Sequence, residues 1–365
     1  MKFLLQHVSA LFVLSLSMSV SLAQYPHHDI YGCEANPTGN PIGGGAGYAD
    51  IPSTGDYVVG TVEELTEALS KAQAGEVVFI PDGVEIDLTG RSDLTIPGGV
   101  TLAGTRGRNG SEGARLYNTP PAYFTGIRTG GENIRVTGLR FDGGYPERTR
   151  EVWRDCLFSI NHRGAEIDNC EICNFSASAI AVGRYATHLH IHHNNLHHIQ
   201  RDGLGYPVSA NSSEVRVIAN KFDYGRHHIA SSGVPGVGYE FAWNWVGPNA
   251  TSTQVDMHGG RDRSDGTDIA GDWMHVHHNT FLSPLRHIGI RGKPSQGAEI
   301  HNNWFTQPHG EASVYATGNT RVYNNVSGPD REPQPYPYRI TALLEGNIPG
   351  TEPLEGVVRP PWLSD

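Results

Sequence analysis

Alternating apolar and polar residues recur in short stretches along the chain, from about residue 163 to 328. Val215 and Val217 are two residues apart, as are Met274 and Val276, and this is the period of a β-strand rather than of a helix. An Asn stands beside each stretch, and the repeated ones are Asn194, Asn220, Asn244, Asn279 and Asn303. Successive members of this series are 26, 24, 35 and 24 residues apart. A repeat of this length predicts a solenoid, whose units bury their apolar faces by stacking.

Short strands, frequent bends and one coil in each period are typical of a parallel β-helix, which is an all-β fold. The 45 glycines among 365 residues suit a fold with several turns in every coil. The repeated Asn fits a bend, where its amide can form hydrogen bonds with the backbone above and below. We therefore assign the Asn series a structural role and no chemistry.

The N-terminal part predicts one helix, over residues 61–74. Thr61 and Glu64 form a capping box at its start, and Gly75 is expected to end it. Its apolar face consists of Leu65, Ala68, Leu69 and Ala72. Such a helix would cover the open end of the β-helix and hide its strand edges. Strands are expected at 77–80, 95–102 and 134–141.

Four segments divide the chain. Residues 1–23 have the features of a signal peptide, with Lys2 at the start, an apolar run, and Ser21-Leu22-Ala23 as the cleavage site. Residues 24–56 are an N-terminal extension, 57–328 the β-helix catalytic domain, and 329–365 a Pro-rich tail. No later run is long and apolar enough to span a membrane. The sequence thus predicts a secreted protein, extracellular or periplasmic.

Charge and cysteine content narrow the possible partners. Loss of Lys2 with the leader takes the formal net charge from −11 to −12, which excludes nucleic acid as a natural partner. Four cysteines remain, namely Cys33, Cys156, Cys170 and Cys173. In an oxidising compartment they predict two disulfides, with three pairings open.

Several segments together carry a resemblance. TVEELTEALSKAQAGEVVFIPDG (61–83), LTIPGGVTLAG (94–104) and the coils with HHNTF and IHNNWF resemble the pectate-lyase-like superfamily of right-handed β-helix proteins. This resemblance covers roughly residues 57–328. It implies a right-handed parallel β-helix and a carbohydrate ligand, usually an acidic polysaccharide bound in a groove along the coils. A WIDH segment followed by RxPxxR is absent, as is GHG, so the chemistry has to be argued from the residues.

Counting from the repeated Asn predicts columns of side chains along the coils. Seven residues after Asn194, Asn220 and Asn279 come Arg201, His227 and Arg286, and eight after come Asp202, His228 and His287. The 35-residue unit carries an insertion, residues 254–268, and its segment 256–259 aligns with 289–292. His258 is then expected beside Arg291. The predicted cluster comprises Arg201, His227, His228, His258, Arg261, Arg286, His287 and Arg291.

This cluster suits β-elimination on a uronic-acid polysaccharide, in which a carboxylate is neutralised, a base removes the adjacent proton and an acid protonates the leaving oxygen. Arg291 and Arg261 are expected to neutralise the carboxylate, and His228 or His258 to be the base. Tyr206 is a candidate proton donor, while Lys293 and Arg286 remain open for the base role. The predicted substrate-binding residues are Arg201, Tyr206, Arg226, His227, Arg286, His287 and Lys293. We expect a monomer that acts on an acidic polysaccharide.

Three alternatives stay open. Asp262, Asp265 and Asp268 surround Gly266 at a spacing that Ca²⁺ accepts, although a solvated acidic loop explains them equally well. An inverting glycoside hydrolase would use two carboxylates from Asp202, Asp256, Asp262 and Asp265. A non-catalytic glycan-binding solenoid would use aromatic platforms, but Trp243, Trp245, Trp273 and Trp304 lie where core packing explains them. His190, His192, His275 and His277 are interpreted as a surface stripe.

Overall fold

The computed structural model describes residues 31–92, 94–120, 126–145, 147–148, 156–212, 214–307 and 313–329, together with the backbone of 332–333 and 338–340. The predicted signal peptide and most of the predicted Pro-rich tail lie outside the described residues. Within them, no helix has both the length and the apolar character needed to cross a membrane.

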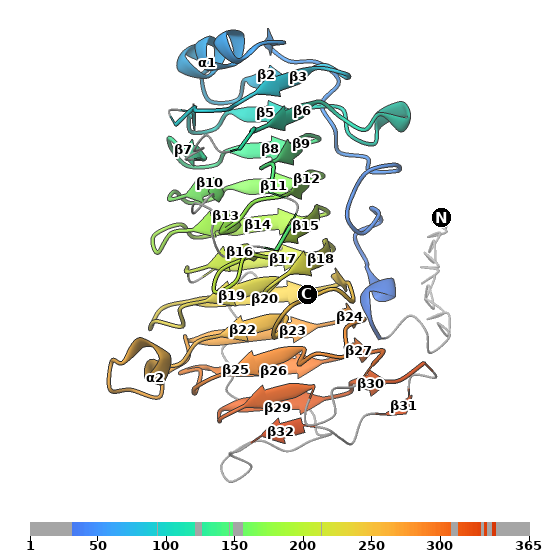
Figure 1. Cartoon of the computed structure of the whole chain (residues 1–365), viewed down its shortest axis with the longest axis vertical. Coiled ribbons are helices and arrows are strands. Elements are labelled where there is room, and N and C mark those ends of the chain that lie inside the picture. Colours follow the sequence, from blue (N-terminus) through green and yellow to red (C-terminus); the bar gives the residue numbers. More distant parts are fainter. Residues whose placement is uncertain are drawn as a thin grey trace, which may run out of the picture.

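Three sheets run the length of the molecule, and each coil gives one strand to each sheet in turn (Figure 1). Sheet A consists of β1 (Tyr57–Val58), β2 (Val77–Phe79), β5 (Thr101–Ala103), β8 (Arg135–Thr137), β11 (Glu166–Asp168), β14 (Leu189–His192), β17 (Val215–Ile218), β20 (Gly238–Ala242), β23 (Trp273–His277), β26 (Gly297–His301) and β29 (Thr320–Tyr323). Sheet B consists of β3 (Glu85–Asp87), β6 (Arg115–Tyr117), β9 (Arg140–Asp142), β12 (Glu171–Cys173), β15 (Asn195–Ile199), β18 (Lys221–Gly225), β21 (Trp245–Val246), β24 (Thr280–Phe281), β27 (Trp304–Phe305), β30 (Val326–Ser327) and β31 (Glu332–Pro333). Sheet C consists of β4 (Thr95–Ile96), β7 (Ile127–Thr129), β10 (Cys156–Ile160), β13 (Ser178–Val182), β16 (Tyr206–Ala210), β19 (Ile229–Ser231), β22 (Val255–Met257), β25 (Ile288–Ile290), β28 (Val314–Ala316) and β32 (Tyr338–Ile340).

The described strand pairs are parallel, apart from the antiparallel pair β30–β31 at the C-terminal end. The fold is a right-handed parallel β-helix, which confirms the sequence prediction. The apolar residues of each strand stack in register inside the coil, and one such row runs through Ile191, Val217, Phe241, Val276 and Ile300. Burial of each such side chain contributes about 1.5–3 kcal/mol.

The repeated Asn forms a ladder at the bend between sheets A and B. The side-chain oxygen of Asn244 accepts a hydrogen bond from the backbone N–H of Asn220 at 2.8 Å, and the Asn220 amide donates to the Ile191 carbonyl at 2.9 Å. The same pattern repeats along the ladder, whose further members are Asn194, Asn279, Asn303 and Asn325. The residue before each Asn has a positive φ, as at Ala219 (53°), which turns the chain sharply. The structural role expected for the series is confirmed.

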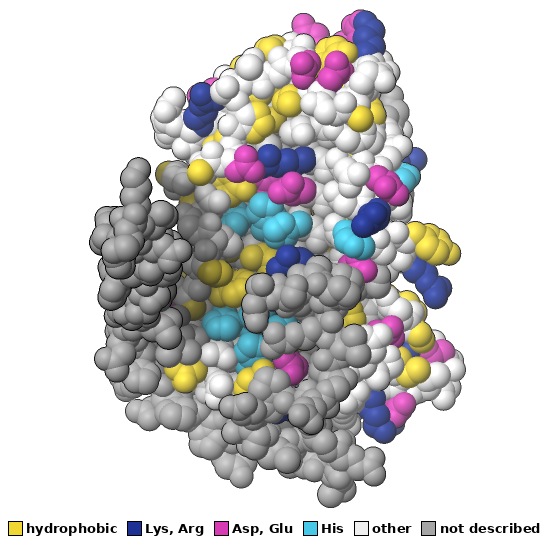
Figure 2. All heavy atoms as spheres, turned by 180° about the vertical axis from the view of Figure 1, so that it is seen from behind, with side chains coloured by type: hydrophobic (Ala, Val, Ile, Leu, Met, Phe, Trp, Pro, Cys, Tyr) yellow, Lys and Arg dark blue, Asp and Glu magenta, His cyan; other side chains and the backbone are white. Residues whose placement is uncertain are grey.

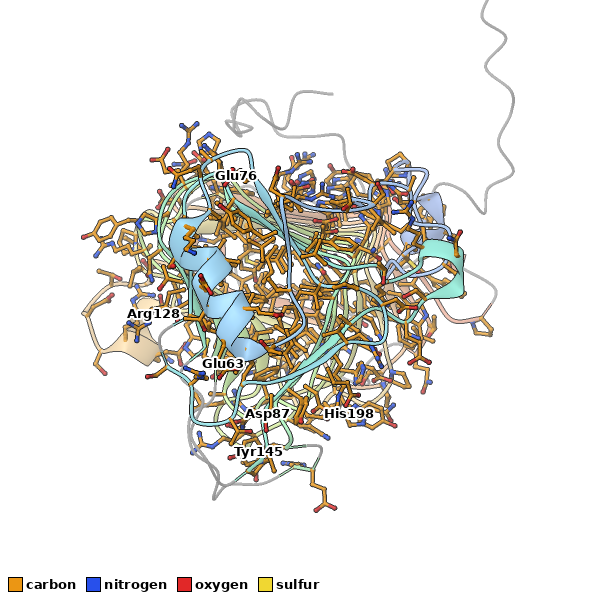
Figure 3. The ribbon with its side chains drawn as sticks, turned by 90° about the horizontal axis from the view of Figure 1, so that it is seen from above. Glu63, Glu76, Asp87, Arg128, Tyr145 and His198 are labelled. Carbon is orange, nitrogen blue, oxygen red and sulfur yellow. The ribbon has the colours of Figure 1, made fainter. Side chains whose placement is uncertain are left out.

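Helix α1 (Val62–Lys71) lies across the N-terminal end of the coils, as the view along the axis shows (Figure 3). The capping box of Thr61 and Glu64 is present, and Leu65 and Leu69 are buried. The helix stops before the expected Gly75, because Ala72 already has extended geometry. A short second helix, α2 (Gly260–Arg263), lies in the insertion, and 3-10 turns occur at Cys33–Ala35 and Arg108–Gly110.

Two of the strands expected from the sequence are each two shorter strands in the structure. Residues 95–102 form β4 and β5 with a turn between them, and 134–141 form β8 and β9. Gly99 and Gly138 have φ values of +73° and +71° at these turns, a conformation that a continuous strand does not contain. Each coil therefore bends between sheets at points where the apolar pattern runs on without a break.

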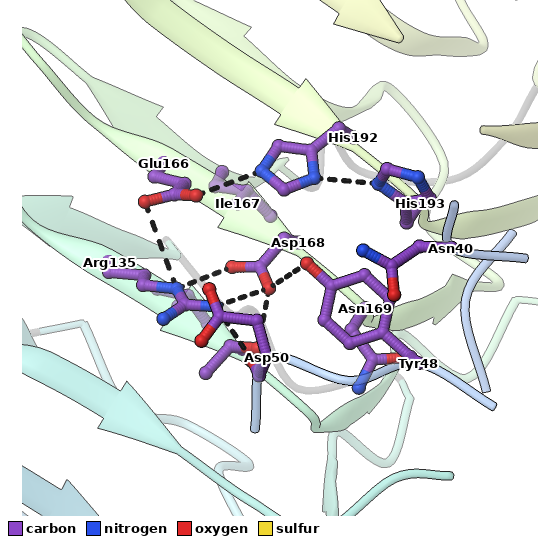
Figure 4. A network of polar contacts seen from close by, with 12 residues as sticks. Asn40, Tyr48, Asp50, Arg135, Glu166, Ile167, Asp168, Asn169, His192 and His193 are labelled. Atoms are coloured by element: carbon purple, nitrogen blue, oxygen red, sulfur yellow. Dashed lines mark hydrogen bonds and ion pairs between the residues drawn. The ribbon is translucent and has the colours of Figure 1, made fainter. Parts of the chain in front are cut away.

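The N-terminal extension packs along the outside of the coils. The backbone N–H of Gly32 donates to the Asn302 carbonyl near the C-terminal end of the coils, and that of Gly43 donates to the Ala219 carbonyl midway. The Tyr48 hydroxyl donates to Asp168 nearer the N-terminal end. We call the described part of this extension, residues 31–56, the strap. Figure 4 shows one of its contacts with the coils: the Asp168 carboxylate accepts hydrogen bonds from Tyr48 at 2.8 Å and from the Arg135 guanidinium at 2.8 and 2.9 Å. Because Asp168 is fully buried, these bonds stabilise a charge that would otherwise be costly to bury.

The two predicted disulfides do not form, since no bond joins any two of the four cysteines. Cys170 is buried in the core, whereas Cys173 lies on the outer side of β12, because side chains three residues apart in extended chain point to opposite faces. Cys156 is in sheet C, and Cys33 lies in the strap next to Thr280. Burial raises the pKa of the Cys33 and Cys170 thiols to about 12.

Candidate functional site

The site is built on the outer face of sheet C, where β22 and β25 lie side by side. Val255 and Met257 point into the core, so Asp256 and the following His258 point outward. The strands pair Asp256 with Gly289 and Met257 with Ile290, which brings His258 next to Arg291. The expected neighbourhood of His258 and Arg291 is thereby confirmed.

Asp256 is the centre of the site, and it is 1 % exposed. The Arg291 guanidinium grips both of its oxygens, with Nε at 3.0 Å from Oδ1 and Nη2 on Oδ2. His258 Nε2 lies 3.0 Å from Oδ2 and 3.1 Å from Arg291 Nη2. Burial raises the pKa of Asp256, but the hydrogen bonds from His258 and Arg291 outweigh it and lower the pKa to about 2. The carboxylate is therefore ionised at neutral pH and orients both partners.

A second layer of aromatic and basic side chains lies beside Asp256. His227 Nε2 is 3.9 Å from Asp256 Oδ2, and its Nδ1–H donates to the Thr253 carbonyl. Its ring stacks on Tyr206, with 5.7 Å between centroids, and the Arg226 guanidinium lies 5.9 Å from the Tyr206 ring. Burial lowers the pKa of His227 to about 4, so this imidazole is neutral. Its part is to hold Tyr206 in place.

The insertion closes the other side of the site. Arg263 anchors it, because its Nη1 donates to the carbonyls of Ser232 at 2.9 Å and Gly233 at 2.7 Å. An open pocket of about 420 Å³ separates the insertion from the coils. Its lining is Arg261, Asp262, Thr267, Asp268, Arg291, Gly292, Lys293, Tyr315 and Thr317. Lys293 pairs there with Asp268 at 3.0 Å, and Arg291 Nη1 reaches Asp262 at 3.4 Å.

Small side chains form the floor beside Asp256. The outward positions of sheet C that share its register are Ser159, Ala181, Ser209, Ala230, Gly289 and Tyr315. A β-carbon on Gly289 would come within 3.4 Å of Asp256 Oδ1. Gly289 thus leaves room for the Asp256 carboxylate on this face of the sheet.

Three predicted carboxylate ligands for Ca²⁺ are held apart. The Asp262 carboxylate accepts hydrogen bonds from the Gly259 N–H and from Arg291. The Asp265 carboxylate accepts from Thr267 and Arg263, and Asp268 forms an ion pair with Lys293. Among the described residues, the groups that could share a metal ion are His275 with His277 and His301, and Glu166 with His190 and His192. The carboxylates of the acidic loop are thus paired with Arg263 of the loop itself and with Arg291 and Lys293 of the next coil.

Two expected members of the cluster are buried inside the coil. His228 is 0 % exposed against Phe222, and burial lowers its pKa to about 4. His287 is also 0 % exposed, with Nε2 at 2.8 Å from the Ser283 carbonyl. Neither side chain can contact a polysaccharide, so the base and substrate-binding roles expected for them are wrong. Both lie at the corner before a strand, where the side-chain alternation is broken.

Arg201 does not share the column of His227. The register pairs Val208 with Ile229, so Tyr206, and not Arg201, is level with His227. The turn before β16, residues 200–205, is longer than the turn of the next coil, residues 226–228, which shifts Arg201 and Asp202 away from His227. Asp202 pairs with Arg148 at 2.6 Å. Arg286 occupies the expected column, with its guanidinium 5.2 Å from the Tyr315 ring.

Comparison with known proteins adds little to this description. No protein family matches the chain, and no curated protein does either. Among solved structures, the chain is similar to the crystal structure of alginate lyase from Paenibacillus sp. str. FPU-7, with 12 % identity and a TM-score of 0.42. The likeness covers 74 % of this chain and 94 % of that one. It does not identify the function, which therefore has to come from the site.

Proposed function

We propose that this protein is a secreted polysaccharide lyase that cleaves a uronic-acid-containing polysaccharide by β-elimination on the outer face of sheet C. One observation carries the proposal: a buried, ionised Asp256 holds His258 and Arg291 beside a pocket lined by further cations. A buried charge with a perturbed pKa is a frequent feature of functional sites, and Asp256 lies next to this pocket.

His258 is the base in this proposal. His258 Nε2 lies 3.0 Å from the Asp256 carboxylate, which only accepts, and 3.1 Å from Arg291 Nη2, which only donates. In this proposal Nε2 carries the proton and donates it to Asp256. The lone pair is then on Nδ1, on the ring's other side, and the side chain is 31 % exposed. Nδ1 takes the proton from the carbon next to the uronic carboxylate, and Asp256 stabilises the imidazolium that forms.

The substrate carboxylate would be neutralised by Lys293 and Arg261. The present partner of Lys293 is Asp268, which is 67 % exposed, and an exposed pair of this kind is weak. A substrate carboxylate can therefore replace Asp268. Arg291 is held by Asp256 and Asp262, so its charge stays in place and adds to the positive field at the carbanion that develops.

Tyr315 is the proton donor in this proposal. It lines the same pocket as Arg291 and Lys293, whereas Tyr206 lies on the far side of the His227 ring. As the bond from carbon to the glycosidic oxygen breaks, a carbon–carbon double bond forms and the Tyr315 hydroxyl protonates the leaving oxygen. The proton on His258 then returns to solvent and Tyr315 is reprotonated, so the site is restored.

Two of the four candidate aspartates, Asp256 and Asp265, do not suit the hydrolase alternative. An inverting hydrolase needs one carboxylic acid that keeps its proton near neutral pH. The pKa of Asp256 is about 2, and hydrogen bonds lower the pKa of Asp265 as well. These groups are ionised, so they are poor general acids.

The test is ultraviolet absorbance of the protein mixed with alginate, glucuronan, pectin and glycosaminoglycans, with and without a chelator. A rise with one substrate is the expected result, because β-elimination creates a double bond conjugated with the carboxylate. The chelator arm tests whether cleavage needs a divalent ion such as Ca²⁺. New reducing ends without absorbance would overturn the proposal in favour of hydrolysis, and binding without products would leave a glycan-binding solenoid.

A further inference from the structure

Histidines gather on the outer face of sheet A, far from the sheet that carries Asp256. Figure 2 shows histidine side chains grouped at two heights on one face of the molecule. Strands β23 and β26 pair His277 with His301, and His275 points to the same side as His277 because it lies two residues before it. One nitrogen from each of these three rings lies within 4.8 Å of the other two.

The rings are already turned toward one another. The Nε2 atoms of His275 and His301 are 2.7 Å apart, and the rings of His277 and His301 are stacked, with 5.1 Å between centroids. His301 Nδ1 lies 2.8 Å from the Asn302 side-chain oxygen. Because that oxygen only accepts, Nδ1 carries the hydrogen and Nε2 carries the lone pair. Histidines that bind metal ions are commonly held this way, with the second nitrogen on an acceptor.

A buried carboxylate stands next to this group. Glu240 is 2 % exposed, its Oε1 lies 3.1 Å from His277 Nε2, and its Oε2 pairs with Arg216 at 2.7 Å. The carboxylate therefore fixes the ring of His277 and supplies negative charge close to where a cation would lie. Partial exposure of His275 and His301 leaves the group accessible from one side.

We propose that His275, His277 and His301 form a binding site for a divalent transition-metal ion of the zinc type. Neutral imidazoles suit Zn²⁺, Ni²⁺ and Cu²⁺ better than Ca²⁺ or Mg²⁺. With metal–nitrogen distances of about 2.0–2.1 Å, tetrahedral ligands lie roughly 3.3 Å apart. His275 and His301 thus need to separate by less than about 1 Å. The proton between their Nε2 atoms moves to Nδ1 of His275, so that both Nε2 lone pairs face the ion. A fourth position stays open for water or another ligand.

The other group, Glu166 with His190 and His192, is a poorer candidate. It offers two imidazoles, and its carboxylate already pairs with His192 at 2.9 Å and with Arg135 at 3.8 Å (Figure 4). Because this group offers one imidazole fewer, we assign the site to the three histidines of β23 and β26. The group at β11 and β14 serves as the internal control.

The experiment uses the full chain without an affinity tag, stripped with a chelator and dialysed. Zn²⁺ is titrated against a chromophoric zinc chelator at pH 7.5 and at pH 5. The expected result is one tightly bound ion per chain, with His275→Gln and His301→Gln each weakening it at least tenfold and His190→Gln leaving it unchanged. Binding is expected to fall at pH 5, because the imidazoles must lose their protons.

Thermal unfolding keeps the test decisive if a variant is destabilised. Zn²⁺ should raise the melting temperature of the wild type and of His190→Gln, but not that of His301→Gln. Equal zinc affinity and equal thermal shift in wild type and His301→Gln would overturn the proposal. Polysaccharide cleavage is measured separately on sheet C residues, so its failure and the failure of this site are distinguishable.

Discussion

The clearest energetic prediction of the structure concerns Asp256, whose contribution to the free energy of folding depends on pH. In Asp256→Asn the shape of the side chain is kept, but the charge that holds Arg291 and His258 is lost. Asp256 is almost wholly buried, and its pKa falls from 3.8 to about 2. A difference of this size corresponds to roughly 2–3 kcal/mol of folding free energy at neutral pH. We expect the variant to lose about this much.

The sign of the pH dependence follows from the direction of the shift. Because the folded protein holds Asp256 at a lowered pKa, its stabilisation is complete above the unfolded pKa of about 3.8 and is lost as the pH falls toward 2. Urea unfolding followed by tryptophan fluorescence should give a gap between wild type and Asp256→Asn at pH 7 that narrows steadily below pH 4. Asp268→Asn removes an exposed carboxylate with a similar cation partner and should change little. A gap of equal size at pH 7 and at pH 2.5 would refute the reasoning.

Three further predictions concern the ladder, the base and the pocket. Asn220→Ala leaves the buried carbonyl of Ile191 and the buried N–H of Asn194 without their side-chain partner, at about 1–3 kcal/mol each. Its melting temperature should therefore fall well below that of the half-buried control Asn195→Ala, and equal melting would contradict the ladder. His258→Gln should lower turnover by about 10²–10⁴ and leave the melting temperature unchanged. The control is His197→Gln, which breaks a histidine–carboxylate pair on sheet B and should leave turnover unchanged. Near-wild-type activity of His258→Gln would remove His258 from the mechanism. Lys293→Met should raise KM for an acidic polysaccharide about tenfold at low salt, and less at high salt because salt screens the lost charge. An unaltered KM would show that Lys293 does not contact the substrate.

The sequence predicted the parts of the fold that recur in every coil. The Asn series reports one bend per coil, and each Asn bonds to the next in the structure, as between Asn220 and Asn244. Pairing of His258 with Arg291 was also predictable, because the strands that carry them, β22 and β25, share their register along the full length. Local patterns thus suffice where the spacing is constant.

Other parts depend on geometry that the pattern does not contain. The count from Asn194 to Arg201 was wrong because the turn before Tyr206 is longer than in the next coil, and a count holds only while turns are equal. His228 was misplaced because a corner residue can turn inward whatever the alternation. Asp256 was one of four candidate aspartates, and its burial together with the two hydrogen bonds from Arg291 of the neighbouring coil distinguishes it.

The cysteines show a different kind of error. A secretory leader predicts an oxidising compartment, and four cysteines allow two disulfides in three possible pairings. The compartment does not show which cysteines lie close enough to bond. Cys170 points into the core and Cys173 out of it, so the Cys-x-x-Cys spacing cannot close across an extended strand. Sheet assignment, which requires the fold, decides the outcome.

Cleavage in water labelled with heavy oxygen tests the central claim most directly. The polysaccharide that gives the largest absorbance change is digested in labelled water, and the products are weighed by mass spectrometry. β-Elimination adds no water, so we predict unsaturated products that carry no label at the cleaved bond, and no products from His258→Gln. Saturated products that have taken up one labelled oxygen for each cleaved bond, at the new reducing end, would contradict the account and assign the site to hydrolysis.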